Sequence, residues 1–123
     1  MPKTPTTAPH LLLGQQGEET AAKMYQEKGF EIIQRNFRSG KAEIDLIVKK
    51  GNLMVFVEVK TRTSVAFGMP EEDVTKRKAK LIVNAAEQYT YDHHWQFNVR
   101  FDIVAIIITK ENTEITHFED AFY

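Results

Sequence analysis

The chain has 123 residues, of which 42% are hydrophobic and 27% are charged; it can therefore form one domain with its own core, and disorder throughout is excluded. The formal net charge of −1 excludes nucleic-acid binding through bulk positive charge. There is no cysteine, which excludes disulfides, zinc–thiolate sites and cysteine nucleophiles and is compatible with a reducing compartment.

The N-terminal segment, residues 1–13, is predicted to be a flexible tail, and residues 14–123 are predicted to form a single domain. The tail carries proline and threonine where a secretory signal needs an apolar stretch of at least about seven residues. The longest apolar run, residues 103–108, is too short to span a bilayer. We therefore expect a cytoplasmic protein without a membrane partner.

The predicted elements alternate between helix and strand along the chain. Helix formers fill residues 18–28 and are followed by Gly29 as a stop. A second helix is predicted to begin at a cap on Asp73 or Thr75 and to end near Tyr91. Strands are predicted over residues 30–37, 43–48, 53–60, 99–109 and 114–118. The order of one helix, three strands, one helix and two strands predicts an α/β fold with a mixed sheet.

The second and third predicted strands form a hairpin around the turn Gly51-Asn52. This turn pairs residue 50 with residue 53, and counting back places Asp45 opposite Glu58 and Glu43 opposite Lys60. The four charges then share one side of the sheet, with directly opposed Cβ atoms about 4.5–5.5 Å apart. The other side is predicted to be apolar and covered by a helix, and consists of Ile44, Leu46, Val48, Val55, Val57 and Val59.

This charged cluster has two interpretations. Carboxylates directly opposite each other repel, and a divalent cation such as Mg²⁺ or Mn²⁺, which prefers oxygen ligands, resolves that repulsion. Alternatively, Glu43 pairs with Lys60 and Lys41 pairs with Glu58 on a solvated face. The interleaved Ile47 and Phe56 indicate a partly buried face, which favours the metal site.

The pattern D-(x)12-E-x-K on a hairpin, preceded by Glu18 in a G-x-x-G-E segment, resembles the PD-(D/E)xK nuclease superfamily. The chain is more closely similar to the bacterial YraN family, itself similar to archaeal Holliday-junction resolvases. The matching stretches, in order, are GQQGEETAAKMY, GFEIIQRNFRS, EIDLIV, VFVEVKTR, the turn containing Gly68 and Pro70, and RFDIVAI. They extend over about residues 14–108.

The resemblance implies a restriction-endonuclease-like fold and a Mg²⁺- or Mn²⁺-dependent endonuclease acting on DNA, with branched or structured DNA as a candidate substrate. Asp45, Glu58 and the Val59 carbonyl would bind the metal, and Glu18 would be an additional ligand. Lys60 would orient the attacking water or offset charge on the phosphate, and Glu43 would have a supporting role. A homodimer is a further expectation, because symmetric cutting of a branched duplex needs two sites.

Two groups of basic residues are candidates for nucleic-acid binding. The first lies in the opening turns of the second predicted helix, where each cation opposes the macrodipole by about 0.3–1 kcal/mol; an anion site and a solvated charged face both explain it. It consists of Lys76, Arg77, Lys78 and Lys80. The second group flanks the hairpin and is expected to line a phosphate track. It consists of Arg35, Arg38, Lys41 and Arg62.

Two other functions stay open: a non-catalytic nucleic-acid-binding module, and a protein-interaction domain whose acidic cluster is structural. The remaining polar candidates are given structural roles. Adjacent histidines on a helix point about 100° apart, which argues against joint chelation by His93 and His94. We expect an ion pair between Arg100 and Asp102. His10 and His117 are expected on the surface, and Trp95 and Phe97 in the core or an interface.

Overall fold

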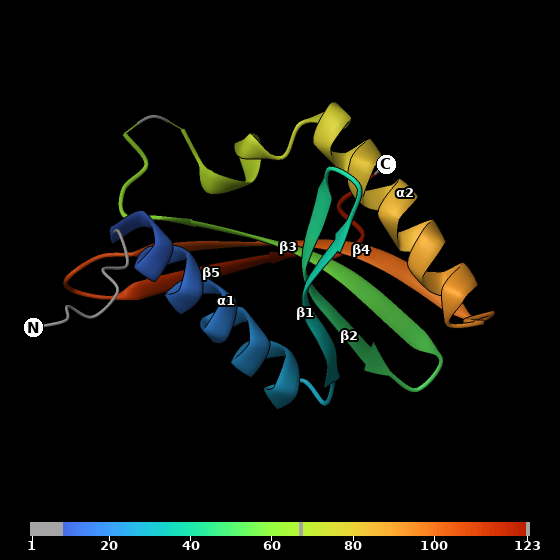
Figure 1. Cartoon of the computed structure of the whole chain (residues 1–123). Coiled ribbons are helices and arrows are strands. Elements are labelled where there is room, and N and C mark those ends of the chain that lie inside the picture. The colour runs from blue at the N-terminus through green and yellow to red at the C-terminus, as the bar shows by residue number, and fades with distance from the viewer. Residues whose placement is uncertain (1–8, 67, 123) are drawn as a thin grey trace, which may run out of the picture.

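The computed structural model describes residues 9–66 and 68–122 and has two long helices and a five-stranded sheet (Figure 1). The element order matches the predicted α/β order of one helix, three strands, one helix and two strands. A short 3₁₀ helix, η1, precedes the second long helix. The elements are α1 (Pro9–Glu27), β1 (Glu31–Ser39), β2 (Ala42–Lys50), β3 (Leu53–Arg62), η1 (Pro70–Asp73), α2 (Lys76–Asp92), β4 (Asn98–Ile108) and β5 (Thr113–Phe118).

The strands lie in the sheet in chain order, from β1 at one edge to β5 at the other. Neighbouring strands are antiparallel except for β3 and β4, which are parallel. A parallel pair needs a long crossover connection, and η1 and α2 provide it. The sheet is therefore mixed, as the sequence predicted.

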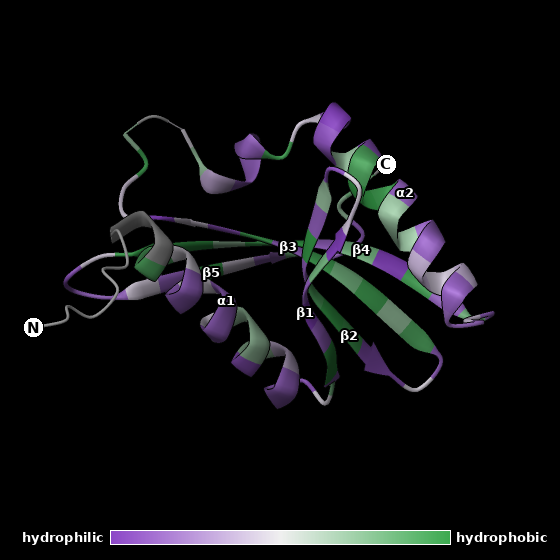
Figure 2. Cartoon of the chain, in the orientation of Figure 1, coloured by the Kyte–Doolittle hydropathy of each residue, from purple (hydrophilic) through white to green (hydrophobic). Residues whose placement is uncertain are grey.

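The two long helices cover opposite faces of the sheet (Figure 1). On one face Ala21, Ala22 and Tyr25 of α1 pack on the valines of β2 and β3. On the other face α2 packs on Phe56 and its neighbours with an apolar stripe that contains Ile82. In Figure 2 the central strands are largely hydrophobic, and both long helices contain hydrophilic as well as hydrophobic residues. The charged hairpin thus lies within a three-layer structure.

The first helix begins earlier than predicted, at Pro9 instead of after Gly14. Proline is favoured at the first position of a helix because its missing N–H would have no partner there. The helix therefore includes residues 9–13 of the segment predicted as tail, while residues 1–8 lie outside the described part of the chain. In the described residues, no helix combines the length and apolar character needed to cross a membrane.

The β2–β3 hairpin has the predicted register close to its turn. Lys50 pairs with Leu53, and Gly51 has φ +58°, a conformation that a tight turn requires and glycine adopts without strain. The ladder ends at the pair Leu46–Val57, one pair short of the predicted contact between Asp45 and Glu58. Beyond this point β2 pairs only with β1.

The departure of β2 from β3 coincides with a bend in the β1–β2 pair. Ile44 packs in the cluster below α2, whereas Leu46, two residues along, packs below α1. The prediction that Ile44 shares one face with Leu46 and the valines is therefore wrong. In β1, between the partners of these two residues, Asn36 has φ +53°, a left-handed conformation that asparagine tolerates better than most residues. The bend lies next to Asp45, where the β2–β3 ladder has ended.

Candidate active site at the β2–β3 hairpin

Two acidic side chains face each other where β2 and β3 separate. Asp45 Oδ2 accepts a hydrogen bond of 2.7 Å from the Val59 backbone N–H, so a side chain replaces the next bond of the ladder. The carboxyl group of Glu58 lines the same cavity as that of Asp45 and is close enough for its negative charge to disfavour ionisation of Asp45. The two carboxyl groups that the predicted register placed opposite each other therefore do lie together, although the backbone ladder has ended.

Both carboxyl groups line a cavity of about 270 Å³. The cavity brings together all four charges of the predicted cluster with two further lysines, one of them from α2. Its lining residues are Lys41, Glu43, Asp45, Glu58, Val59, Lys60 and Lys78. The sequence therefore predicted correctly that Glu43, Asp45, Glu58 and Lys60 gather in one place.

Burial makes the acidic pair unfavourable when both members are ionised. Burial, followed by the negative charge of Glu58, raises the pKa of Asp45 to about 8. The Val59 N–H opposes this rise, since it donates to the carboxylate. Glu58 is only 4% exposed, and a carboxylate so deeply buried needs a counter-ion.

The counter-ion of Glu58 comes from α2. The Lys78 ammonium forms an ion pair with Glu58 Oε2. Burial is the largest single influence and lowers the pKa of Lys78, but the bond to Glu58 and the negative charges of Glu58 and Asp45 together raise it, and the net shift is upward. Burial and the neighbouring Lys78 lower the pKa of Lys60. The alternative pairing of Lys41 with Glu58 and Lys60 with Glu43 is absent among the ion pairs of residues 9–66 and 68–122, and Arg38 is the partner of Glu43 at 3.6 Å.

The first helix brings Glu18 within electrostatic reach of the same acids. Burial and then the charge of Glu43 raise the pKa of Glu18, and Glu58 contributes to the rise. The approach of the helix depends on Gly17, because a Cβ at this position would lie 1.8 Å from Thr61 Oγ1 on β3. A side chain at residue 17 would push α1 and Glu18 away from the sheet.

The residues at the hairpin offer oxygen donors of the kind that Mg²⁺ and Mn²⁺ prefer. Asp45 and Glu58 supply carboxylates. Within one antiparallel pair a residue directs both its N–H and its C=O to the same neighbour, so the Val59 carbonyl faces the β2 side, like the N–H that binds Asp45. No group of three or more His, Asp or Glu side chains in the described segments is arranged to hold a metal. Two carboxylates and one carbonyl are fewer than the six ligands of an octahedral Mg²⁺ ion, which usually keeps several waters.

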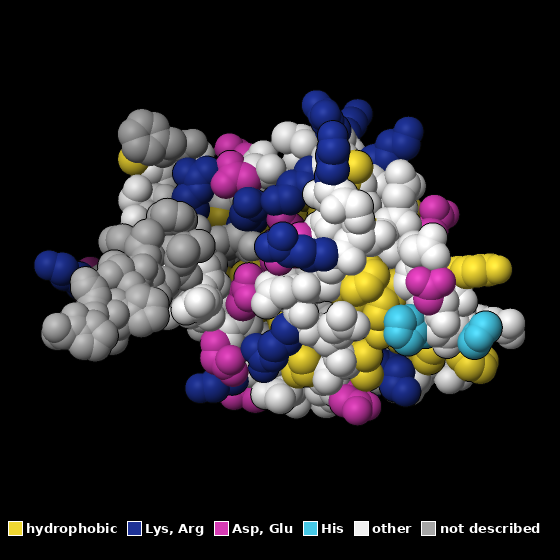
Figure 3. All heavy atoms as spheres, viewed as in Figure 1, with side chains coloured by type: hydrophobic (Ala, Val, Ile, Leu, Met, Phe, Trp, Pro, Cys, Tyr) yellow, Lys and Arg dark blue, Asp and Glu magenta, His cyan; other side chains and the backbone are white. Residues whose placement is uncertain are grey.

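The predicted nucleic-acid-binding residues are divided by the structure into paired and unpaired groups. Four form ion pairs: Lys78 with Glu58, as described above, Arg35 with Glu19 at 3.2 Å, Arg38 with Glu43 at 3.6 Å, and Arg62 with Asp73 at 2.6 Å. Lys76, Arg77 and Lys80 are exposed on α2, and Lys41 is exposed at the cavity. In Figure 3, lysine and arginine side chains gather over the beginning of α2 and the β1–β2 hairpin, with acidic side chains between them.

Lys78 has a different position from its basic neighbours, and its contact with Glu58 was not predicted from the sequence. A helix cap fixes the backbone here, as Thr75 Oγ1 accepts a hydrogen bond of 3.2 Å from the Lys78 N–H. The side chain points to the cavity and contacts Glu58. The available signal was the helical periodicity, since Lys78 falls on the apolar stripe of α2, where a charge needs a buried partner.

Asp102 is a second buried acid, and its complete burial was not predicted from the sequence. It is fully buried and receives two hydrogen bonds from Arg100, which confirms the predicted ion pair. Tyr25 Oη donates to Asp102 Oδ2 at 2.7 Å, and His117 Nε2 lies 2.7 Å from the same oxygen. The expected surface position of His117 is therefore wrong, because its side chain is 8% exposed. The side chain of His10 lies outside the described residues.

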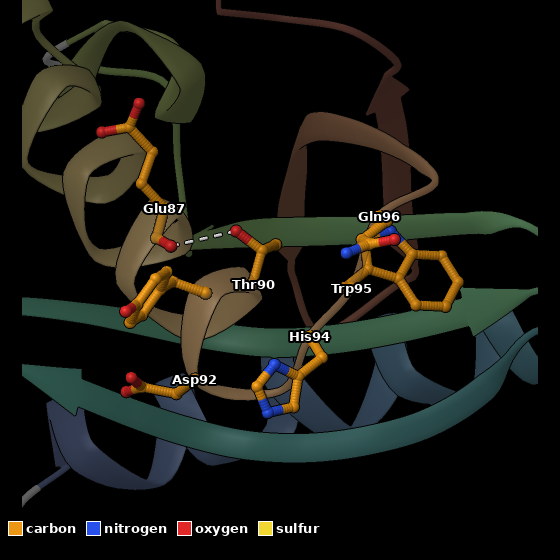
Figure 4. A pocket seen from close by; sticks show the side chains of 7 residues that line it. Glu87, Thr90, Asp92, His94, Trp95 and Gln96 are labelled. Atoms are coloured by element: carbon orange, nitrogen blue, oxygen red, sulfur yellow. Dashed lines mark hydrogen bonds between the residues drawn. The ribbon is translucent and has the colours of Figure 1, made fainter.

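A larger cavity, of about 690 Å³, lies at the other end of α2 (Figure 4). Figure 4 shows the carboxylates of Glu87 and Asp92 on one side, Trp95 and Gln96 on the other, and His94 between them. The His93 ring instead stacks on Tyr89 and bonds its backbone carbonyl. The side chains here do not converge on one point, so the hairpin cavity is the better candidate for chemistry.

Comparison with known proteins connects this fold to one bacterial family. Residues 17–106 match the family described as "Uncharacterised protein family UPF0102". The UPF0102 protein FP2501 of Flavobacterium psychrophilum is 42% identical over 116 residues, which cover 94% of this chain and 98% of that protein. The UPF0102 protein RHA1_ro06551 of Rhodococcus jostii is 45% identical over 118 residues, covering 94% and 99%. The matched segment contains the whole hairpin cavity, and the chain belongs to the UPF0102 family.

Proposed function

We propose that the protein is a metal-dependent endonuclease that hydrolyses phosphodiester bonds of DNA. The observation that supports this most is the cavity in which Asp45 and Glu58 face each other, with Lys60 beside them. A structural role alone gives no reason to place two carboxyl groups together inside a partly buried cavity. A nuclease needs such a pair to hold a divalent cation next to the scissile phosphate.

The residues of the cavity have different roles in the proposed reaction. Asp45, Glu58 and the Val59 carbonyl would hold Mg²⁺ or Mn²⁺, and Glu18 would approach from α1 as an additional ligand or as a general base. A cation held there would supply activation of water and stabilisation of negative charge on the phosphoryl oxygens. Lys60, whose pKa burial lowers, orients the attacking water or offsets negative charge on the phosphate.

The basic surface around the cavity contributes binding instead of chemistry. Lys41, Lys76, Arg77 and Lys80 are exposed beside the site, and contacts from such side chains to phosphates position a duplex without reading its sequence. Arg35, Arg38 and Arg62 are engaged in ion pairs and would have to exchange an acidic partner for a phosphate. The resemblance to resolvases makes branched DNA and a homodimer the first substrate and assembly to test.

The decisive experiment is Mn²⁺-dependent cleavage of a panel of labelled DNAs: linear duplex, single strand, flap and four-way junction. Wild type is compared with Asp45→Ala and Lys60→Ala. Matched controls are Asp92→Ala and Lys110→Ala, which remove the same charges at exposed positions outside the cavity. Loss of a metal ligand should abolish cleavage, and loss of Lys60 should lower it by about 10²–10³-fold, as for a single group that stabilises a transition state.

The outcomes separate the three functions. Cleavage by wild type and both controls, lost in the two cavity variants, supports the nuclease. Salt-sensitive DNA binding without cleavage in any condition would replace it with a binding module. Absence of DNA binding at low salt, together with no stabilisation by Mn²⁺, would leave a protein-interaction domain.

A further inference from the structure

The ammonium of Lys78 lies on the carboxylate that the proposed metal needs. We propose that Lys78 is an internal counter-ion that occupies Glu58 in the metal-free protein and that a divalent cation must displace it to load the site. This inference rests on the proposed function, and it adds a competition built into the fold. It assigns to Lys78 a role other than contact with nucleic acid.

Three observations fix Lys78 in this place. Its backbone is held by the Thr75 cap at the start of α2. Its side chain is 36% exposed, while its partner Glu58 is 4% exposed, so the lysine stem extends from solvent into the cavity. The ion pair joins α2 to β3 across the cavity in which Asp45 also lies.

The counter-ion is needed because of burial. Glu58 and Asp102 are the two buried charged side chains in the described part of the chain. Asp102 is neutralised by Arg100 and by bonds from Tyr25 and His117, whereas Glu58 has Lys78 as its ion-pair partner. An unpaired buried carboxylate would be strongly destabilising, so Lys78 keeps the metal-free cavity folded.

The same contact is incompatible with a loaded site. A Mg²⁺ ion binds carboxylate oxygens at about 2.0–2.1 Å, and Asp45 and Lys78 line the same cavity as Glu58. The lysine ammonium and the divalent cation are therefore alternative partners for one carboxylate. Lys60 lines the same cavity without an ion pair among the described residues, so it adds positive charge but does not occupy Glu58.

The test measures Mn²⁺ affinity by isothermal titration calorimetry, without DNA and at one pH. Wild type is compared with Lys78→Met, with Lys78→Gln as a second variant that can still donate a hydrogen bond to Glu58. Lys80→Met removes an equal charge outside the cavity, and Lys60→Met removes one inside it. Competition predicts that Lys78→Met binds Mn²⁺ about tenfold or more tightly than wild type, with smaller gains in both controls.

A second readout is how the difference in unfolding temperature between wild type and Lys78→Met depends on Mn²⁺. If Lys78 had only a structural role, this difference would not depend on Mn²⁺. Without metal, Lys78→Met should unfold at a lower temperature than wild type. With saturating Mn²⁺ this gap should close, because the cation replaces the lost ammonium. A gap that stays the same with and without Mn²⁺ would assign Lys78 to packing alone and overturn the inference.

The remaining outcomes distinguish this inference from the proposed function. Mn²⁺ binding that is lost in Asp45→Ala but equal in wild type and Lys78→Met overturns the competition and leaves the metal site intact. An equal gain in Mn²⁺ affinity in Lys60→Met and Lys78→Met would show that any positive charge in the cavity weakens Mn²⁺ binding. This outcome also overturns the competition for Glu58. If neither wild type nor Lys78→Met binds Mn²⁺, the competition and the proposed function fail together.

Discussion

Replacing Asp45 by asparagine should stabilise the metal-free protein at high pH. The amide oxygen can still accept the hydrogen bond from the Val59 N–H, while the repulsion from Glu58 disappears. The variant therefore keeps the shape of the site and removes one buried charge. If the acid pair is functional, a substitution that removes the activity is expected to stabilise the fold.

The magnitude follows from the pKa of Asp45, which is about 8 in the folded protein against the ordinary value of 3.8. Between these values the folded state holds a proton that the unfolded state has released, so stability falls as the pH rises through this window. At about 1.4 kcal/mol per pH unit the full loss would be about 6 kcal/mol. Water in the cavity screens part of the charge, and we expect asparagine to recover about 2–4 kcal/mol at pH 8 and little near pH 4.

The assay is urea unfolding in EDTA at a series of pH values from 4 to 9, followed by circular dichroism and by the fluorescence of Trp95, the single tryptophan. Asp92→Asn, exposed at the end of α2, controls for the loss of one negative charge. Saturating Mn²⁺ should stabilise wild type and leave Asp45→Asn unchanged. A difference between Asp45→Asn and wild type that is constant from pH 4 to pH 8 would refute the reasoning.

Two further substitutions test the surroundings of the site. Gly17→Ala should destabilise the protein by about 1–3 kcal/mol in thermal unfolding, because the new Cβ would lie 1.8 Å from Thr61 Oγ1. Adding Thr61→Ala should recover part of this loss. Wild-type stability in the Gly17→Ala variant would contradict the close approach of α1 to β3. Asp102→Asn should cost about 3–5 kcal/mol at neutral pH. Although burial raises the pKa of Asp102, its hydrogen bonds lower the pKa to about 2. The difference in unfolding free energy between wild type and Asp102→Asn should therefore shrink as the pH falls from about 4 towards 2. A difference that does not vary with pH would contradict the view that the Asp102 carboxylate is stabilised by these bonds.

Local sequence signals predicted most of the fold. The alternation of apolar residues around Gly51-Asn52 was sufficient for the hairpin and for its register near the turn, since both depend on neighbours in the chain. The cap at Thr75 is likewise local, and it is formed as expected. The start of α1 at Pro9 also had a local signal, the preference of proline for the first helical position, which the prediction did not use.

The missed features depend on contacts between segments far apart in the chain. The ion pair of Lys78 with Glu58 exists because α2 crosses from β3 to β4 above the hairpin, and no spacing in the sequence specifies that docking. His117 reaches Asp102 from β5 for the same reason. The bend that moves Ile44 to the other core depends on Asn36 in the neighbouring strand. Such pairings follow from packing, which periodicity alone does not describe.

The hydrogen bond that replaces the end of the β2–β3 ladder makes the site accessible to NMR spectroscopy. The Val59 amide proton is directed at the Asp45 carboxylate, 2.7 Å from N to Oδ2. A bond to a charged acceptor is shorter and stronger than one to a neutral acceptor, so the ¹H shift of this amide should move downfield as Asp45 loses its proton. One resonance can therefore follow ionisation and cation loading at the hairpin without any substrate.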